Sequence, residues 1–312
     1  MIELRRVCRN YGPSQALSDV SFVVPDHGVL GLLGVNGAGK TTALNVMTGY
    51  LPPTSGEVLV DGRSLLREPR ACKRRIGYLP EVPPLYDEMT VTDFLAFVCR
   101  LREVVGRAIP DHVREIIALC GLPEVAGKPI GKLSKGYRQR VGIASALCGD
   151  PATVVLDEPT VGLDPRQVVE TRELIAELGK THAVIFSSHQ LSEVLKLCGR
   201  VVILHQGRVV REAKLDELSG EGGQRLQLRA MGKPERLIPA LRGVEGVRRL
   251  RPIPSGDENV TVCEIECARG EQNVQARIFH LLASLDAPIL LLMPGEDSLE
   301  QAFLRLTAGE NG

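Results

Sequence analysis

The stretch Gly34-Val-Asn-Gly-Ala-Gly-Lys-Thr-Thr42 decides the fold of this chain. It matches the phosphate-binding pattern G-x-x-x-x-G-K-[ST] at every fixed position. The apolar run over residues 29–33 predicts a buried strand before it, and residues 41–47 are typical of the start of a helix after it. Because phosphate binds where such a strand turns through glycines into a helix, the sequence predicts a P-loop site for a nucleoside triphosphate.

The residue types of the loop suit that ligand. Glycines bring backbone N–H groups close to phosphate oxygens, and the helix N-terminus adds a favourable dipole. We expect Lys40 to neutralise the β- and γ-phosphates and the Thr41 hydroxyl to hold Mg²⁺. The alternative, a glycine-rich turn without a ligand, is disfavoured by this Lys-Thr pair. The other predicted nucleotide contacts in the loop are Gly34, Asn36, Gly37, Gly39 and Thr42.

Composition indicates a globular chain of two-domain size, with 312 residues of which 44% are hydrophobic. No stretch reaches the roughly 18 uncharged apolar residues that a membrane span needs, and the first residues lack the apolar core of a signal peptide. The formal net charge of zero argues against a general nucleic-acid-binding role.

The eight cysteines show no C-x-x-C pair and no accompanying histidine cluster, so the spacing of a metal site is absent. Cys263 and Cys267 are four apart in an alternating segment, which predicts that they share one face of a strand. We interpret the cysteines as reduced and mostly buried, in a reducing compartment such as the cytosol.

The order of the predicted elements describes an α/β domain with an insertion. Strands are expected over residues 2–8, 20–24, 57–60, 75–79, 153–156, 183–186 and 201–204. Helices are expected after Asp164-Pro165 and over 190–197, and a block of helices runs from about residue 90 to 149, beginning at the capping box Thr90-Val-Thr-Asp93. Apolar strands that alternate with helices predict a parallel sheet covered on both faces, into which the block at 90–149 is inserted.

A polar, glycine-rich stretch then predicts a linker. Beyond it we expect strands at 224–228 and 260–265 and helices at 271–285 and 298–307, the last beginning with a capping box at Ser298. These elements predict a small α+β domain, for which a ferredoxin-like arrangement is one candidate. The predicted division is 1–218, a linker at 219–223, and 224–312.

Two adjacent carboxylates end the apolar segment 153–156, in a Walker B pattern. Asp157 is expected to hold Mg²⁺ through water, and Glu158 to polarise the attacking water as a general base. An ordinary solvated turn is the alternative, and the distance from the P-loop disfavours it.

Between these motifs, Leu133-Ser-Lys-Gly-Tyr-Arg-Gln139 resembles the signature motif of the ATP-binding cassette (ABC) family, and the resemblance extends over about residues 2–218. It implies a P-loop NTPase fold with an inserted helical subdomain that hydrolyses ATP with Mg²⁺. It also implies a homodimer, in which Ser134 and Gly136 of one subunit contact the γ-phosphate held by the P-loop of the other.

The same resemblance implies further site residues. Tyr11 stands where the family stacks an aromatic ring on adenine, although a packed tyrosine at a strand end is the alternative. His189, in Ser187-Ser-His189, would hydrogen-bond the γ-phosphate. Asp164 would reach across the subunit boundary, or cap the next helix, or do both. Glu81 replaces the usual glutamine and adds an acidic group near the nucleotide and Mg²⁺.

Two signature positions depart from the family pattern, where Lys135 replaces glycine and Tyr137 replaces glutamine. With these residues the signature, the segment 76–86 and the ending 298–307 resemble the ATPase subunits of bacterial ABC-2-type exporters. That subgroup implies a separate integral-membrane permease, received in a groove formed by residues 81–97, and a location on the cytoplasmic face of the inner membrane.

A soluble ABC ATPase acting on a ribosome or nucleic acid is the competing class. Ribosomal members usually carry two cassettes, whereas this chain has one P-loop and one signature. DNA-repair members insert a long coiled coil, for which the roughly fifty residues between Glu81 and Ser134 leave no room. A binding module without catalysis would need the loss of Lys40 or Glu158, and both are present.

Overall fold

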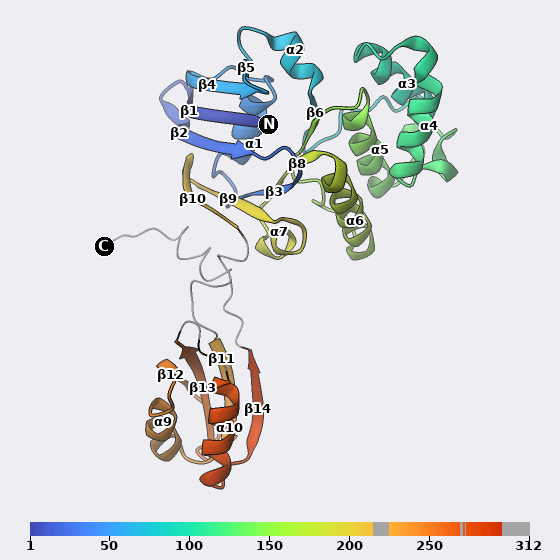
Figure 1. Cartoon of the computed structure of the whole chain (residues 1–312). Coiled ribbons are helices and arrows are strands. Elements are labelled where there is room, and N and C mark those ends of the chain that lie inside the picture. Colours follow the sequence, from blue (N-terminus) through green and yellow to red (C-terminus); the bar gives the residue numbers. More distant parts are fainter. Residues whose placement is uncertain (215–224, 269–270, 272, 295–312) are drawn as a thin grey trace. The chain divides into compact units, whose positions relative to one another are not determined.

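The computed structural model describes residues 1–214, 225–268, 271 and 273–294, and the chain forms two compact units, Met1–Leu215 and Asp216–Gly312 (Figure 1). The predicted linker and the predicted helix at 298–307 lie outside the described residues. No helix within the described ranges combines the length and apolar character needed to cross a membrane.

The central sheet of the first unit has six strands in the order β10-β9-β3-β8-β7-β6. They are β3 (Gly28–Leu33), β6 (Ile76–Leu79), β7 (Thr153–Leu156), β8 (Ala183–Ser188), β9 (Arg200–His205) and β10 (Arg208–Lys214). Five of them run parallel, and β10 pairs antiparallel with β9 at one edge. Every residue of β7 and β8 is buried, as expected for strands covered on both faces. The prediction of a parallel sheet is confirmed.

Helices and a second sheet cover the two faces of this sheet (Figure 1). One buried apolar cluster joins the central sheet to α1 (Lys40–Met47) and to the antiparallel sheet, through residues such as Leu32, Leu44 and Phe22. On the other face, α6 (Pro165–Thr181) and α7 (Leu191–Leu197) contact β3. The P-loop therefore connects a strand of the central sheet, β3, to a helix packed on one face of that sheet, α1.

The second sheet has the order β2-β1-β4-β5 and pairs β1 with β2 and β4 in antiparallel fashion. Its strands are β1 (Ile2–Tyr11), β2 (Ser14–Val24), β4 (Ser55–Val60) and β5 (Arg63–Ser64). The predicted start of the second strand at residue 20 is wrong, because β2 pairs with β1 back to Ser14 and the connection is a tight turn at Gly12. Register shifts within this pair and exposed polar residues interrupt the alternation that reveals a strand.

The inserted helices are α3 (Val91–Leu101), α4 (Ile109–Leu119) and α5 (Lys135–Leu147), which form a separate group beside β6 (Figure 1). Thr90 caps α3 as predicted, with its hydroxyl accepting a hydrogen bond from the Asp93 N–H at 3.1 Å. α5 contacts β6 and β7, and its closest approaches to β6 come from Gly142 and Ala146 in its second half. The short helix α2 (Pro69–Arg74) has no apolar periodicity and was not predicted.

The second unit has the element order β11-α9-β12-β13-α10-β14. Its bounds are β11 (Arg225–Met231), α9 (Pro234–Arg242), β12 (Val247–Ile253), β13 (Val260–Cys267), α10 (Val274–Ser284) and β14 (Ile289–Pro294). The antiparallel sheet order β12-β13-β11-β14 is the ferredoxin-like arrangement. Cys263 and Cys267 lie on its buried face, as predicted, and all eight cysteines are free thiols.

Candidate nucleotide site

The P-loop is built where β3 ends and α1 begins, and two of its glycines are required by close contacts. A Cβ on Gly34 would lie 2.7 Å from the carbonyl oxygen of Leu204. Gly39 has a φ of +101°, and a Cβ there would lie 2.8 Å from the carbonyl oxygen of Ala16. The loop is thus pressed against β2 and β9 at a distance that only glycine allows.

Lys40 starts α1 and folds back over the loop. Its side chain is 6% exposed, and its Nζ donates a hydrogen bond to the carbonyl oxygen of Gly34 at 2.8 Å. The same ammonium lies 3.3 Å from Oε1 of Glu158. Lys40 therefore holds the loop in a closed turn and places its charge at the centre of the site.

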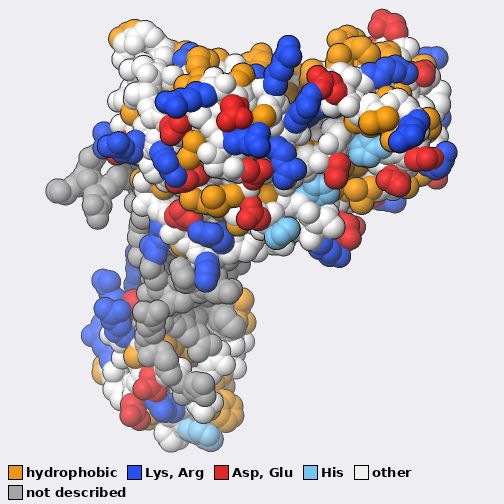
Figure 2. Space-filling model, turned by 45° about the horizontal axis from the view of Figure 1, so that its top comes forward, with side chains coloured by type: hydrophobic (Ala, Val, Ile, Leu, Met, Phe, Trp, Pro, Cys, Tyr) orange, Lys and Arg blue, Asp and Glu red, His pale blue; other side chains and the backbone are white. Residues whose placement is uncertain are grey.

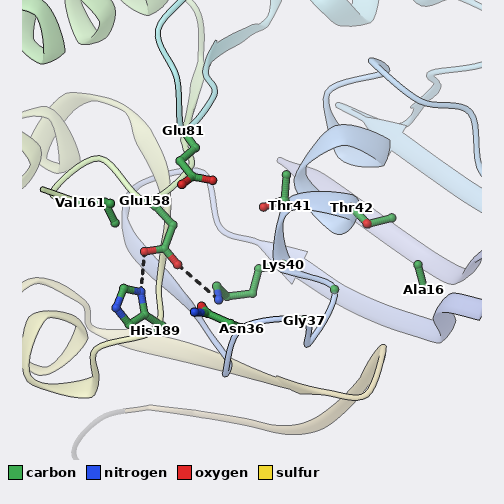
Figure 3. Close-up of a pocket in the computed structure, with 11 residues that line it drawn as sticks. Ala16, Asn36, Gly37, Lys40, Thr41, Thr42, Glu81, Glu158, Val161 and His189 are labelled. Atoms are coloured by element: carbon green, nitrogen blue, oxygen red, sulfur yellow. Dashed lines mark hydrogen bonds and ion pairs between the residues drawn. The ribbon is translucent and has the colours of Figure 1, made fainter.

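Glu158 and His189 come from the ends of neighbouring parallel strands, β7 and β8, and point toward each other (Figure 3). His189 Nδ1 donates to Glu158 Oε2 at 2.8 Å, because a carboxylate can only accept. Glu158 has a φ of +47°, a sparsely populated region for a residue with a side chain. Its N–H donates to the Ser187 hydroxyl at 2.8 Å, which supports this backbone geometry.

Asp157 lies one residue earlier and is completely buried. Its Oδ1 accepts a hydrogen bond from the Ser187 hydroxyl at 2.6 Å, whereas its Oδ2 has no hydrogen-bond partner in the described part of the chain. Burial raises the pKa of Asp157, and the hydroxyls of Ser187 and Thr41 oppose that rise. A buried carboxylate oxygen without a partner is costly and suits a site that receives a cation.

These side chains surround a pocket of about 460 Å³. Its lining residues are Ala16, Asn36, Gly37, Gly39, Lys40, Thr41, Thr42, Glu81, Glu158, Val161 and His189. Glu81 enters from the loop after β6, on the side of the pocket opposite Lys40 and Asn36 (Figure 3). The pocket thus brings together nine of the residues predicted from the sequence. Gly34 and Asp157 do not line it, but each is joined to a lining residue, Gly34 by the hydrogen bond from Lys40 and Asp157 as the neighbour of Glu158.

Tyr11 is not among the residues that line this pocket. Tyr11 as a residue is 46% exposed, and the Arg9 guanidinium lies over its ring at 4.9 Å from the ring centroid. Ala16 of the same hairpin lines the pocket instead. The adenine-stacking role of Tyr11 stays a prediction.

The signature residues and Asp164 lie at a second place. Ser134 caps α5, with its hydroxyl 3.5 Å from the Tyr137 N–H, and Asp164 caps α6 by accepting from the Gln167 N–H at 2.9 Å. Gly136 is buried, and a Cβ on it would overlap the Gln167 side chain. Gly136 and Asp164 share a pocket of about 390 Å³ with Arg140 and Glu170. Within the described chain this pocket is separate from that of the P-loop.

Three contributors to the site are not predicted from the sequence, and of these only Ser187 stands in a quoted motif, without a role. Ser187 holds both Asp157 and the Glu158 backbone, and Val161 and Ala16 line the pocket. The position of Ser187 at the end of an apolar segment was the available signal, since the carboxyl ends of adjacent parallel strands meet at one edge of a sheet.

Comparison with known proteins identifies the family. The family model described as ABC transporter matches residues 17–161. The chain is 31% identical over 317 aligned residues to the linearmycin resistance ATP-binding protein LnrL of Bacillus subtilis, with 98% of each chain covered. The chain is a member of the ABC transporter family.

Two further likenesses extend this result to the whole chain and to the fold. The bacitracin transport ATP-binding protein BcrA of Bacillus licheniformis is 29% identical over 311 residues, covering 99% of this chain and 98% of BcrA. The dimeric structure of the bacterial ABC transporter cassette MJ0796 matches with a TM-score of 0.62 and 26% identity, covering 69% of this chain and 99% of that cassette. This ABC protein is therefore an ATP-binding, ATP-hydrolysing transporter subunit.

Proposed function

We propose that this chain is the ATPase subunit of an ABC-2-type exporter, in which ATP-driven dimerisation of two cassettes powers a separate permease. The observation that carries the catalytic part is the setting of Glu158, whose two oxygens face Lys40 at 3.3 Å and His189 at 2.8 Å in one pocket. The exporter assignment is supported by the full-length similarity to LnrL and BcrA, whose names describe resistance and transport.

In this proposal each side chain of the pocket has one task. Lys40 leaves Glu158 and neutralises the β- and γ-phosphates, which frees a carboxylate oxygen to accept a proton from the attacking water. His189 hydrogen-bonds the γ-phosphate. A neutral ring whose Nδ1–H is given to Glu158 offers only an acceptor at Nε2, so donation to phosphate requires a second proton or release from Glu158. While the ring is neutral, Glu158 and the γ-phosphate therefore compete for its single N–H.

We propose that Mg²⁺ accompanies the nucleotide, held by Thr41 and Asp157 with Glu81 nearby. The buried, unpartnered Oδ2 of Asp157 suits a cation or its bound water. No group of three His, Cys, Asp or Glu side chains in the described ranges could hold a metal alone. That fits Mg²⁺, which usually binds one or two carboxylates and completes its shell with waters and phosphate oxygens. When bound, it would neutralise charge that develops on the phosphates.

We further propose that two copies form the catalytic unit. Ser134 and Gly136 open α5 and do not line the P-loop pocket of their own chain, so we expect them to meet the γ-phosphate held by a second subunit. The dimeric MJ0796 cassette supports this arrangement. The permease would then dock at residues 81–97, at the cytoplasmic face of the inner membrane.

A soluble ATPase acting on a ribosome or nucleic acid is disfavoured. Binding to RNA or DNA requires a surface patch rich in Lys and Arg. On the face drawn in Figure 2, Lys and Arg side chains are interspersed with Asp and Glu side chains, and the chain has a formal net charge of zero. We therefore expect no nucleic-acid partner.

Purification from native membranes tests this function. Tagged Glu158→Gln protein is solubilised in mild detergent with ATP and Mg²⁺, and co-purifying proteins are identified by mass spectrometry; Glu173→Gln, an exposed change on α6, is the control. A stoichiometric polytopic membrane protein supports the transporter, and its sequence narrows the cargo. Ribosomal or DNA-bound partners without a membrane protein would favour the soluble class instead.

A further inference from the structure

Glu193 is a buried carboxylate outside the residues that line the nucleotide pocket. It lies in the first turn of α7 and is only 5% exposed. In the part of the chain that the structure describes it forms no ion pair, so hydrogen bonds must offset the cost of burying its charge. A buried polar group of this kind calls for an explanation.

Its hydrogen bonds come from two hydroxyls, one in the turn that follows β7 and one at the last residue of β8. Thr160 and Ser188 both donate to Oε2 of Glu193, at 2.9 and 3.0 Å. The Ser188 hydroxyl also accepts the N–H of Gln190 at 3.0 Å. The other acceptor in reach of the hydroxyl proton, the Gln190 carbonyl oxygen, lies farther away than Glu193, at 3.5 Å. All three side chains are nearly or fully buried, with Thr160 at 6% and Ser188 at 1% exposure.

The two donors lie next to the side chains proposed to react. Thr160 follows Glu158 by two residues, and Ser188 directly precedes His189. The helix that bears Glu193 packs closely on the sheet. A Cβ added to Gly31 of β3 would lie only 2.6 Å from Cγ1 of Val194, the residue after Glu193. Oε2 of Glu193, on a helix that packs against β3, thus links the residues that follow β7 to the end of β8.

We propose that Glu193 is a positioning residue that holds the Glu158 and His189 loops in register for hydrolysis. The inference rests on the proposed roles of Glu158 and His189. It needs no contact between Glu193 and nucleotide, because a displacement of about 1 Å of a reacting group can cost on the order of 10²-fold in rate.

Steady-state kinetics of the full chain test the inference. Glu193→Ala leaves two hydroxyls without their acceptor, and we expect kcat to fall about 10- to 100-fold. KM for ATP should stay within about twofold, because the P-loop contacts are untouched. Glu193→Gln should restore kcat to within a few-fold of wild type, since both hydroxyls donate to one oxygen that an amide also provides. Glu173→Ala, on the exposed side of α6, is the control.

Three results would overturn it: wild-type kcat in Glu193→Ala, a KM that rises as much as kcat falls, or Glu193→Gln as slow as Glu193→Ala. If Glu193→Ala does not fold, Thr160→Val and Ser188→Ala replace it. Each should lower kcat several-fold, and the double variant should lose less than the product of the two; wild-type kcat in both would refute the inference. Glu158→Gln is measured in parallel, so that failure of the proposed catalytic role of Glu158 can be told from failure of the inference about Glu193. Normal turnover in Glu158→Gln would refute the catalytic role itself.

Discussion

Nδ1 of His189 lies 2.8 Å from Oε2 of Glu158, and this bond joins the ends of two adjacent parallel strands. Together with Lys40 at 3.3 Å from Oε1, it means that both oxygens of the proposed base have a partner within the chain. We expect bound ATP to draw Lys40 to its phosphates and so leave Glu158 Oε1 free for water.

Replacement of His189 tests its side of this arrangement. We expect His189→Ala to lower ATP turnover about 10²-fold, because the γ-phosphate loses a hydrogen-bond partner and Glu158 loses its orienting contact. ATP affinity should change little, since the P-loop supplies most of the phosphate contacts. His280→Ala, on the exposed part of α10, is the matched control, and comparable loss in both variants would contradict the assignment.

Asp157 provides a test through stability and pH. Burial raises its pKa, so the folded state holds a proton there more tightly than the unfolded state, and ionised Asp157 lowers stability at neutral pH. We expect Asp157→Asn to raise the melting temperature of the nucleotide-free protein by about 2–4 °C, roughly 1 kcal/mol, while Mg²⁺-dependent hydrolysis is lost.

The sign of the pH effect follows from the same shift. The stability penalty of Asp157 appears as pH rises from its ordinary pKa of about 3.9 through the raised value. The advantage of Asp157→Asn should therefore shrink as pH falls toward that range. Calorimetry at several pH values measures the difference in melting temperature between Asp157→Asn and wild type. If the variant melts below wild type at pH 7, burial of the Asp157 charge does not destabilise the fold.

Tyr11 separates two interpretations of an exposed ring. If adenine stacks on it, Tyr11→Ala should raise KM for ATP about 10-fold with kcat unchanged, because stacking a base is worth roughly 1–3 kcal/mol. Tyr11→Phe keeps the ring and should behave as wild type. An unchanged KM in Tyr11→Ala would favour the packed strand-end tyrosine, over which Arg9 already lies.

Asp164 allows its capping role to be measured by itself. Its carboxylate accepts from the Gln167 N–H at 2.9 Å, so Asp164→Ala should lower the free energy of unfolding by about 1 kcal/mol. Asp164→Asn keeps a good capping side chain and should unfold in urea as wild type does. Equal losses in both variants would mean that charge, not capping, stabilises α6.

The parts of the fold that the sequence predicts are those with strong local signals. The P-loop is recognisable because its residue types are tied to backbone geometry, and β7 and β8 because strands buried on both faces are continuously apolar. Thr90 and Asp164 mark helix starts through the chemistry of their side chains. These signals need no knowledge of distant contacts.

The elements that were missed have weak or misleading local patterns. β10 lies at a sheet edge, and β12 has a single buried residue, Leu250, among exposed ones. α9 carries a proline inside the helix, at Pro239, which a sequence pattern treats as a break. The secondary structure of these segments depends on contacts with distant parts of the chain, so the local sequence does not predict it.

The candidate site divides in the same way. Motif positions predict most of the pocket, because a P-loop and a Walker B strand constrain their own residues. The hydrogen bonds of Ser187 to Asp157 and of Thr160 to Glu193 link residues about thirty positions apart. Those side chains come together only because of the order of the strands in the sheet, and a local sequence pattern does not predict that order.

The Glu158→Gln variant tests the central claim most directly. Its ATP affinity and its ATP hydrolysis are measured on the same full-length preparation, with Glu173→Gln as the control. Loss of a general base should slow hydrolysis by about 10²-fold or more while ATP still binds, and ATP-bound dimer should accumulate. Hydrolysis at the wild-type rate would contradict the assignment of Glu158 as the base.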